Sequence, residues 1–229
     1  MDFIINSVFG GVVITFLAYE IGVLIKNKLK IAIFNPLLIS IVLIIGLLKC
    51  FNIDYEVYKT GSQLISYLLT PATVALAIPL YEQIEPLKKN WKAIILGIIS
   101  GALTSAVCVL VMSVIFKLNH EMYVTMLPKS ITTAIGMGVA EEMGGIVTIT
   151  VAVIVVTGIF GNMTAESVCR LFKITEPVAK GIGIGSAAHA MGTTKAMEIG
   201  EIEGAMSSLS IAVSGIITVI VASVFSCIY

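Results

Sequence analysis

Long apolar stretches alternate with short polar segments along this 229-residue chain. A transmembrane helix needs about 20 predominantly apolar residues, and six stretches reach or approach that length. The pattern therefore predicts an all-α, polytopic membrane protein with six full transmembrane helices. Their expected ranges are 3–25, 31–48, 63–80, 93–116, 146–165 and 205–229.

Residues 128–145 break this pattern, because they are rich in glycine and polar side chains although apolar stretches flank them on both sides. A similar segment follows 56 residues later, at 184–203. Paired, interrupted segments at corresponding places point to the binding site of a transporter. Six of fifteen aligned positions are identical: Ser130 and Ser186, Ala134 and Ala190, Gly136 and Gly192, Ala140 and Ala196, Glu142 and Glu198, and Gly144 and Gly200.

The distribution of Lys and Arg indicates how the chain crosses the membrane. The positive-inside rule places the basic turn 26–30 in the cytoplasm, the N-terminus and residues 49–62 outside, and the loop 81–92 inside. If 123–145 is a re-entrant hairpin, nine Lys or Arg lie inside and three outside, whereas a full crossing gives six and six. We therefore expect 123–145 and 184–203 to be two re-entrant hairpins that enter from opposite faces. Broken full spans are the alternative.

Composition agrees with a membrane setting. The chain is 58% hydrophobic and 12% charged, with a mean hydropathy of +1.04, whereas a soluble domain has about 25% charged residues. The formal net charge of zero argues against nucleic acid, which needs a basic face. We expect a single domain over 1–229, with N-terminal helices in 1–122 and inverted hairpin-plus-helix repeats in 123–229.

The sequence indicates neither an enzyme nor a cofactor. The four cysteines are far apart and show no CxxC or Cys/His spacing, so we interpret them as packing residues and expect no metal. Neither a nucleophile elbow nor a phosphate-binding loop is present.

Ionisable and hydroxyl side chains gather in the two repeated segments, and such residues inside a membrane protein are rare and typically functional. Broken helices offer free amides and a partial positive charge that suit a carboxylate. We expect Glu142 and Glu198, at equivalent positions, to couple to protons, because partial desolvation favours the protonated carboxyl group. The expected substrate ligands are Ser130, Thr132, Thr133, Ser186, His189, Thr193, Thr194 and Lys195.

Each of these residues also has a plainer interpretation. Thr132 and Thr133 are about as well explained by hydrogen bonds to their own helix, which hydroxyl side chains commonly make. Lys195 would then neutralise a neighbouring glutamate, and His189 would be a core histidine.

Several motifs resemble the LrgB/CidB family over nearly the whole chain. They are TPATVALAIPLY at 70–81, PKSITT at 128–133, EMGGI at 142–146, SAAHAMGT at 186–193 and EIEGA at 201–205. That family was first described as murein-hydrolase regulators resembling a holin/antiholin pair, and it includes bacterial pyruvate transport systems and the plastid glycolate/glycerate carrier. In that carrier an LrgA-like segment precedes the LrgB-like one. Because this chain has only the LrgB-like part, the resemblance implies a separate small membrane partner of the LrgA/CidA type.

Two functions from different classes follow. The buried charges and paired hairpins favour a proton-coupled secondary transporter subunit for a small monocarboxylate of the pyruvate, glycolate, glycerate or lactate class. The alternative is a holin/antiholin-like regulator of murein hydrolase activity and autolysis, without carrier activity. In both cases we expect a multi-pass protein of the cell (inner or plasma) membrane that forms a homo-oligomer, most simply a dimer, in the lipid bilayer.

Overall fold

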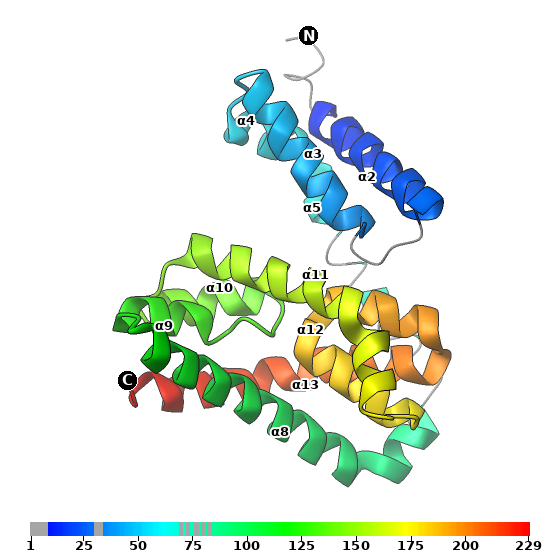
Figure 1. Cartoon of the computed structure of the whole chain (residues 1–229), viewed down its shortest axis with the longest axis vertical. Helices are drawn as coiled ribbons and strands as arrows, with labels where there is room; N and C mark the ends of the chain where they lie inside the picture. Colours follow the sequence, from blue (N-terminus) through cyan, green and yellow to red (C-terminus); the bar gives the residue numbers. More distant parts are fainter. Residues whose placement is uncertain are drawn as a thin grey trace. The chain divides into compact units, whose positions relative to one another are not determined.

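The computed structural model describes residues 9–29, 34–68, 71, 74, 75, 78, 81 and 84–229, without the side chains of residues 86 and 87. Wherever these described residues form regular structure they are helical, and none of them lies in a strand. The chain divides into two compact units, Met1–Ala75 and Leu76–Tyr229 (Figure 1). The prediction of an all-α fold is confirmed.

The first unit is built on one pair of longer helices and two short ones. Its described helices are α2 (Gly10–Leu29), α3 (Pro36–Cys50), α4 (Tyr55–Gly61) and α5 (Gln63–Tyr67).

Two glycines of α2 allow this unit to pack closely. A side chain at Gly22 would collide with the backbone of Pro36, and one at Gly11 would collide with the backbone of Gly61. The start of α3 is fixed by Asn35, whose side chain accepts a hydrogen bond of 2.9 Å from the amide of Leu37. Such capping satisfies an amide that has no partner within the helix.

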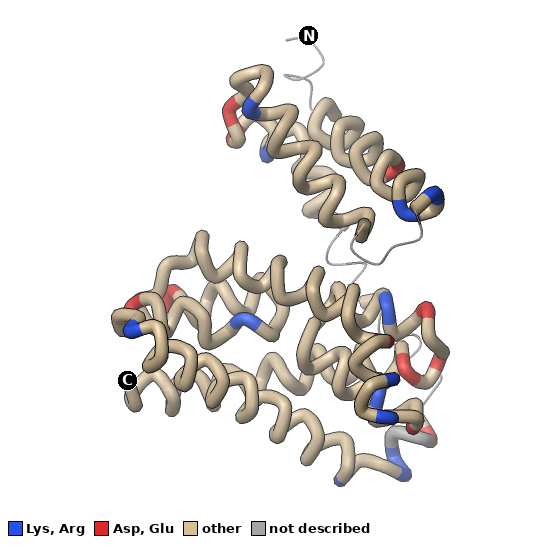
Figure 2. The backbone as a smooth tube through the Cα atoms, viewed as in Figure 1, with Lys and Arg blue, Asp and Glu red and all other residues tan. Residues whose placement is uncertain are grey.

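The second unit is built on three long helices with helical hairpins between them (Figure 1). Among the residues that the structure describes, these are the helices long and apolar enough to cross a membrane. Charged residues of this unit gather mostly near its two ends (Figure 2), as expected where a lipid core surrounds the middle. The long helices are α8 (Ile84–Phe116), α11 (Val147–Leu171) and α13 (Glu201–Ser226).

Hairpin 1 consists of two short helices and an irregular tip: α9 (His120–Met126), residues 127–132 and α10 (Thr133–Glu142). Val139 of α10 lies in the same buried cluster as Tyr123 of α9, so α10 returns along α9. The exit of the hairpin is tied to its entry, because Thr125 Oγ1 accepts a hydrogen bond of 2.8 Å from the amide of Ile146. Hairpin 1 therefore enters and leaves where α8 ends and α11 begins.

Hairpin 2 is α12 (Pro177–Ile199), in which the chain reverses at His189 with φ 42° and ψ −137°. In a straight helix Gly181 and Glu203 would be about 33 Å apart, yet a side chain at Gly181 would collide with the backbone of Glu203. Lys180 Nζ also lies 3.6 Å from Glu203 Oε1. Both arms therefore open where α13 begins. We call them the first and second arms, residues 177–188 and 190–199.

The two hairpins enter from opposite ends of the second unit. Tyr123 of hairpin 1 donates a hydrogen bond of 2.9 Å to the carbonyl of Phe225, near the end of α13. The base of hairpin 2 instead lies by the start of α8, where Glu176 and Lys89 line one pocket. Shifting α9–α10 by 56 residues gives 176–198, within one residue of α12. The sequence repeat is therefore an inverted structural repeat.

Several boundaries differ from the expected ones. α8 begins at Ile84, so most of the expected loop 81–92 is helical. α4 lies within 49–62, which was expected to be a loop. Helical hydrogen bonds do not depend on apolar side chains, so a helix continues past its apolar stretch into polar residues. The expected span 63–80 falls partly outside the described residues. Helix α5 lies at its beginning.

Candidate functional site at the hairpin tips

The tips of the two hairpins meet neighbouring positions near the middle of α8. In hairpin 1, Ser130 Oγ lies 3.3 Å from Ser105 Oγ. In hairpin 2, Ser186 faces Gly101, where an added Cβ would lie 3.2 Å from the Ser186 Oγ; this hydroxyl donates a bond of 2.7 Å to the carbonyl of Ile182. Because Gly101 and Ser105 are one helical turn apart, the repeat-related serines reach the same part of α8.

A single residue of α11, Ile154, also contacts both hairpins. Its carbonyl oxygen lies 3.1 Å from Nε2 of His189, and its side chain occupies the space beside Gly136 of α10. Gly192, the repeat equivalent of Gly136, lies so close to the first arm that an added Cβ would approach the Ile184 carbonyl to 2.9 Å. These repeated glycines therefore allow close packing at the tips.

His189 forms the turn of hairpin 2 and is 3% exposed. Its positive φ is unfavourable for a residue other than glycine. Because the Ile154 carbonyl only accepts, Nε2 donates that bond, and the ring packs on Gly158, where an added Cβ would lie 2.6 Å from Cε1. The backbone carbonyl of His189 accepts a bond of 3.0 Å from Thr193 Oγ1. Protein groups on both sides thus hold the turn.

The other polar groups near the tips also have protein partners. Thr193 is 1% exposed, and its Oγ1 lies 2.7 Å from Ser207 Oγ of α13. Lys129 Nζ donates a hydrogen bond of 2.9 Å to Ser130 Oγ. Among the residues that the structure describes, no three His, Cys, Asp or Glu side chains are placed to hold a metal ion.

Lys195 and Thr194 lie in the second arm, away from the tips. Lys195 Nζ is 2.7 Å from Glu166 Oε1 of α11 and 3.0 Å from Glu198 Oε2. Thr194 is exposed, and its Oγ1 accepts a bond of 3.1 Å from Asn162 Nδ2. This polar cluster fastens the second arm to α11.

The structure does not bring all of the predicted site residues together. Glu142 is exposed at the end of α10, and its repeat equivalent Glu198 is 54% exposed at the base of hairpin 2. Because the hairpins are inverted, equivalent positions far from the tips lie at opposite ends of the unit. Thr132 precedes α10 without a capping bond from its side chain, and Thr133 is the first, half-buried residue of that helix.

Several partners of these residues come from the long helices and were not among the predicted site residues. Ser105, Ile154, Glu166 and Ser207 all contact predicted site residues. Three of them lie in apolar helices that were assigned only to spanning, and Glu166 lies just beyond the expected span 146–165, in a part of α11 that was not expected to be helical. A signal was present in α13, whose serines are buried at 207, 208, 210 and 214. Polar residues repeated within an apolar helix indicate a face that contacts protein.

These features define an all-α membrane protein in which two opposed helical hairpins meet between long helices. The chain belongs to the LrgB-like family, whose sequence model matches residues 15–228. The antiholin-like protein LrgB of Bacillus mycoides strain KBAB4 is 38% identical to it over 216 residues, and that of Bacillus cereus strain B4264 is 37% identical over 216 residues. Both alignments cover 94% of this chain and 94% of the relative. No solved structure matches the chain.

The expected transport function is wrong. We expected a proton-coupled carrier for a small monocarboxylate, but the relatives that align with nearly the whole chain are antiholin-like proteins. The geometry also differs from that of a preformed substrate-binding site. Lys195 is paired with two carboxylates, and the Thr193 hydroxyl is hydrogen-bonded within the protein. The ligand and proton-coupling roles assigned to individual residues depended on that carrier and stay predictions.

Proposed function

We propose that this chain is an antiholin-like protein of the cell membrane that regulates murein hydrolase activity and thereby restrains autolysis. The observation that carries this proposal is the similarity to antiholin-like LrgB proteins over 94% of both chains. The alignments are long enough to include both hairpins and all three long helices of the second unit, so the likeness concerns the whole architecture.

The packing of the hairpins supports a regulator that acts by assembly. Close contacts between hairpin 2 and α13 occur at Gly181 and Gly185, where any side chain would collide with the neighbouring backbone. Helices in a membrane associate through such close packing of small residues. A body held together in this way suits a protein that presents a fixed surface to other membrane proteins.

The partner in this proposal is a small membrane protein of the LrgA type, acting together with a homo-oligomer of this chain. The basic residues Lys89, Arg170 and Lys180 share one end of the second unit with the base of hairpin 2. By the positive-inside rule this end faces the cytoplasm, and hairpin 1 then enters from outside. The first unit begins outside under the same assignment.

The test is a deletion of the encoding gene in its host, with re-expression of the wild-type chain. Without the protein we expect higher murein hydrolase activity in zymograms of culture supernatants and faster lysis after detergent treatment. Re-expression should reverse both effects, and it should do so only when the LrgA-type partner is also present. Unchanged hydrolase activity and unchanged lysis in the deletion strain would contradict the proposal.

A pair of variants tests whether the packing of hairpin 2 is required for this function. Gly185→Val should fail to complement because hairpin 2 no longer packs on α13, whereas Gly138→Val, at an open position of α10, should complement. Both variants are compared at equal amounts of membrane-inserted protein. If Gly185→Val restrains lysis as well as the wild type does, the packed hairpin is not required for regulation.

A further inference from the structure

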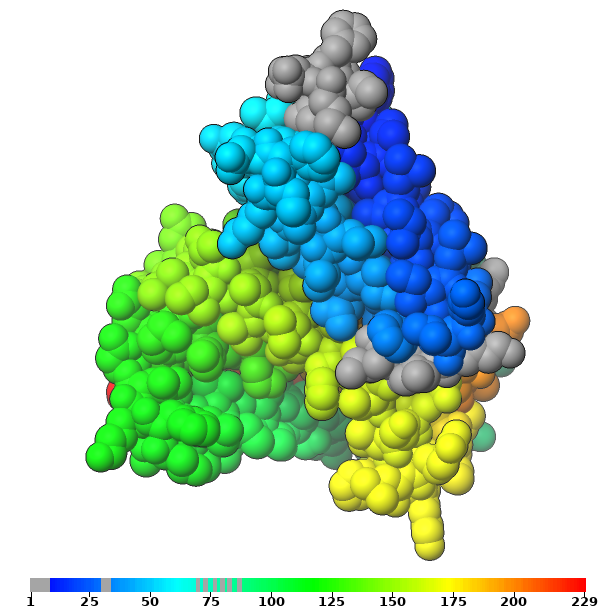
Figure 3. Space-filling view, turned by 45° about the horizontal axis from the view of Figure 1, so that its top comes forward, coloured from blue at the N-terminus to red at the C-terminus, as the bar shows by residue number. Residues whose placement is uncertain are grey.

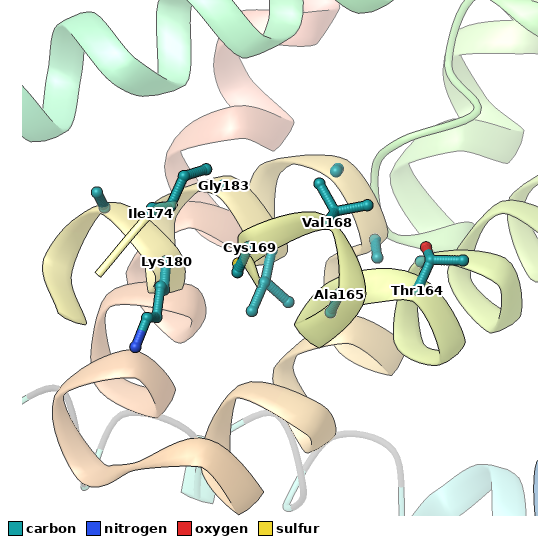
Figure 4. Close-up of a pocket in the computed structure, with 12 residues that line it drawn as sticks. Thr164, Ala165, Val168, Cys169, Ile174, Lys180 and Gly183 are labelled. Carbon is teal, nitrogen blue, oxygen red and sulfur yellow. The ribbon is translucent and has the colours of Figure 1, made fainter. Parts of the chain in front are cut away.

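A groove of about 180 Å³ lies between α11 and the first arm of hairpin 2 (Figure 4). Its walls are almost entirely apolar, and several are small side chains or glycines, which leave room between the two helices. The residues that matter most for the argument are Gly161, Ala165, Val168, Gly183, Ala187 and Ala188.

The mouth of this groove is polar and contains two cations. A second pocket of about 240 Å³ shares Cys169, Ile174 and Lys180 with the groove and adds Arg170 and Glu166 to its lining. The amino group of Lys180 points away from the apolar side chains, at the edge of the groove (Figure 4).

The carboxylates near the mouth already have partners. Glu166 Oε1 lies 2.7 Å from Lys195 Nζ, and Glu203 Oε1 lies 3.6 Å from Lys180 Nζ. The longer of these two contacts leaves Lys180 able to share its charge with a second anion. Arg170 is exposed at the same mouth.

An exposed tryptophan near the mouth indicates the depth of the lipid headgroups. Pro177, one turn before Lys180, lines a pocket together with Asn90, and Trp91 follows directly on α8 with 56% of its surface exposed. Tryptophan side chains concentrate at the membrane–water interface. The yellow segment around residues 165–175 forms an outer surface of the second unit (Figure 3), so the mouth is open to a ligand from the bilayer.

We propose that this groove binds one acyl chain of an anionic phospholipid, with the lipid phosphate held between Lys180 and Arg170. The volume of about 180 Å³ is too small for a partner helix, which is about 10 Å across, but it admits part of a single alkyl chain. An apolar groove with cations at its mouth complements a ligand with an alkyl chain and an anionic head. Basic pockets between membrane helices on the cytoplasmic side bind anionic headgroups in this way.

The test uses the purified full-length chain, with lipid adducts counted by native mass spectrometry and thermal unfolding followed in nanodiscs. Phosphatidylglycerol should give more adducts and a higher Tm than phosphatidylcholine. Gly183→Leu should abolish this preference, because position 183 lines the groove and an added Cβ meets nothing within 4 Å. Gly138→Leu is the matched control at an equally open position outside the groove, and it should keep the preference.

The headgroup contacts are tested separately. Lys180→Gln and Arg170→Gln should each weaken phosphatidylglycerol binding about fivefold, the effect of one basic residue at an anionic surface. Glu203→Gln breaks the ion pair of Lys180 but keeps the cation, so binding should persist or increase. Equal stabilisation by both lipids, full competition by inorganic phosphate, or unchanged binding in Gly183→Leu would each overturn the proposal.

Discussion

The two hairpins reach the same part of α8 and α11 but turn in different ways. Hairpin 1 reverses over the irregular residues 127–132, which separate two short helices. Hairpin 2 reverses at one residue, His189, whose positive φ lets two helical arms follow each other directly. The first turn spreads its conformational cost over several residues, whereas the second concentrates it in one position.

The hairpins also differ in what holds them. Hairpin 2 packs its backbone directly on α13 through Gly181 and Gly185. Hairpin 1 is tied to the start of α11 by hydrogen bonds, in which Thr125 Oγ1 accepts from the amide of Ile146 and the Thr125 carbonyl accepts a bond of 2.9 Å from Thr150 Oγ1. Two copies of a repeat can therefore keep the same shape although different long helices, α13 for one and α11 for the other, hold their arms.

The largest effect should come from filling the packed side of hairpin 2. Gly185→Val places a side chain against the backbone of Ser207, and such overpacking should destabilise the protein by about 3 kcal/mol. Gly138→Val adds the same atoms at an open position of hairpin 1 and should change stability little. The two variants are compared by thermal unfolding in detergent. A similar loss of Tm in both would show that hairpin 2 is not the more tightly packed copy.

The next effect concerns the turn residue itself. His189→Ala removes the hydrogen bond to the Ile154 carbonyl and leaves a space beside Gly158, which should cost about 2 kcal/mol. His189→Gly loses the same contacts but relieves the unfavourable φ, so it should be about 1 kcal/mol more stable than the alanine variant. The order of the two Tm values is the measurement, and the reverse order would rule out a strained turn.

The smallest effect should come from the polar contacts of hairpin 1. Thr125→Val keeps the shape of the side chain but removes the acceptor for the Ile146 amide, at a cost of about 1.5 kcal/mol. Thr164→Val is the control, because its hydroxyl bonds only the Phe160 carbonyl of its own helix. Hydrogen exchange at Ile146 should rise in the first variant alone. Equal Tm values for both would mean that hairpin 1 is held by its apolar cluster.

Much of the fold could be predicted from two features of the sequence. Apolar stretches of sufficient length located α8, α11 and α13, since the bilayer sets their minimum length. The offset of 56 residues between Ser130 and Ser186 located both hairpins, because repeated sequence folds into repeated structure. The charge bias then correctly placed the segment after α11 at the same end as the start of α8.

The site could be predicted only in part, because contacts between distant segments leave little trace in one sequence. Ser130, Ser186, His189 and Thr193 do lie near the tips, but their partners could not be identified from spacing. Lys195 shows why the transport interpretation went wrong. A cation in a glycine-rich segment indicates an anion, and here the anions are the side chains of Glu166 and Glu198.

The inverted arrangement of the hairpins has a consequence for how such a chain could arise by gene duplication. One copy of the repeat contains a long helix, α8 or α11, followed by a hairpin that returns to the side it came from. If the long helix spans the membrane, each copy crosses it once, and an odd number of crossings makes the second copy start on the opposite side. A head-to-tail duplication of this helix-plus-hairpin segment gives two antiparallel copies without any further mutation. An odd number of membrane crossings in the ancestral segment thus accounts for the inverted orientation of the two hairpins.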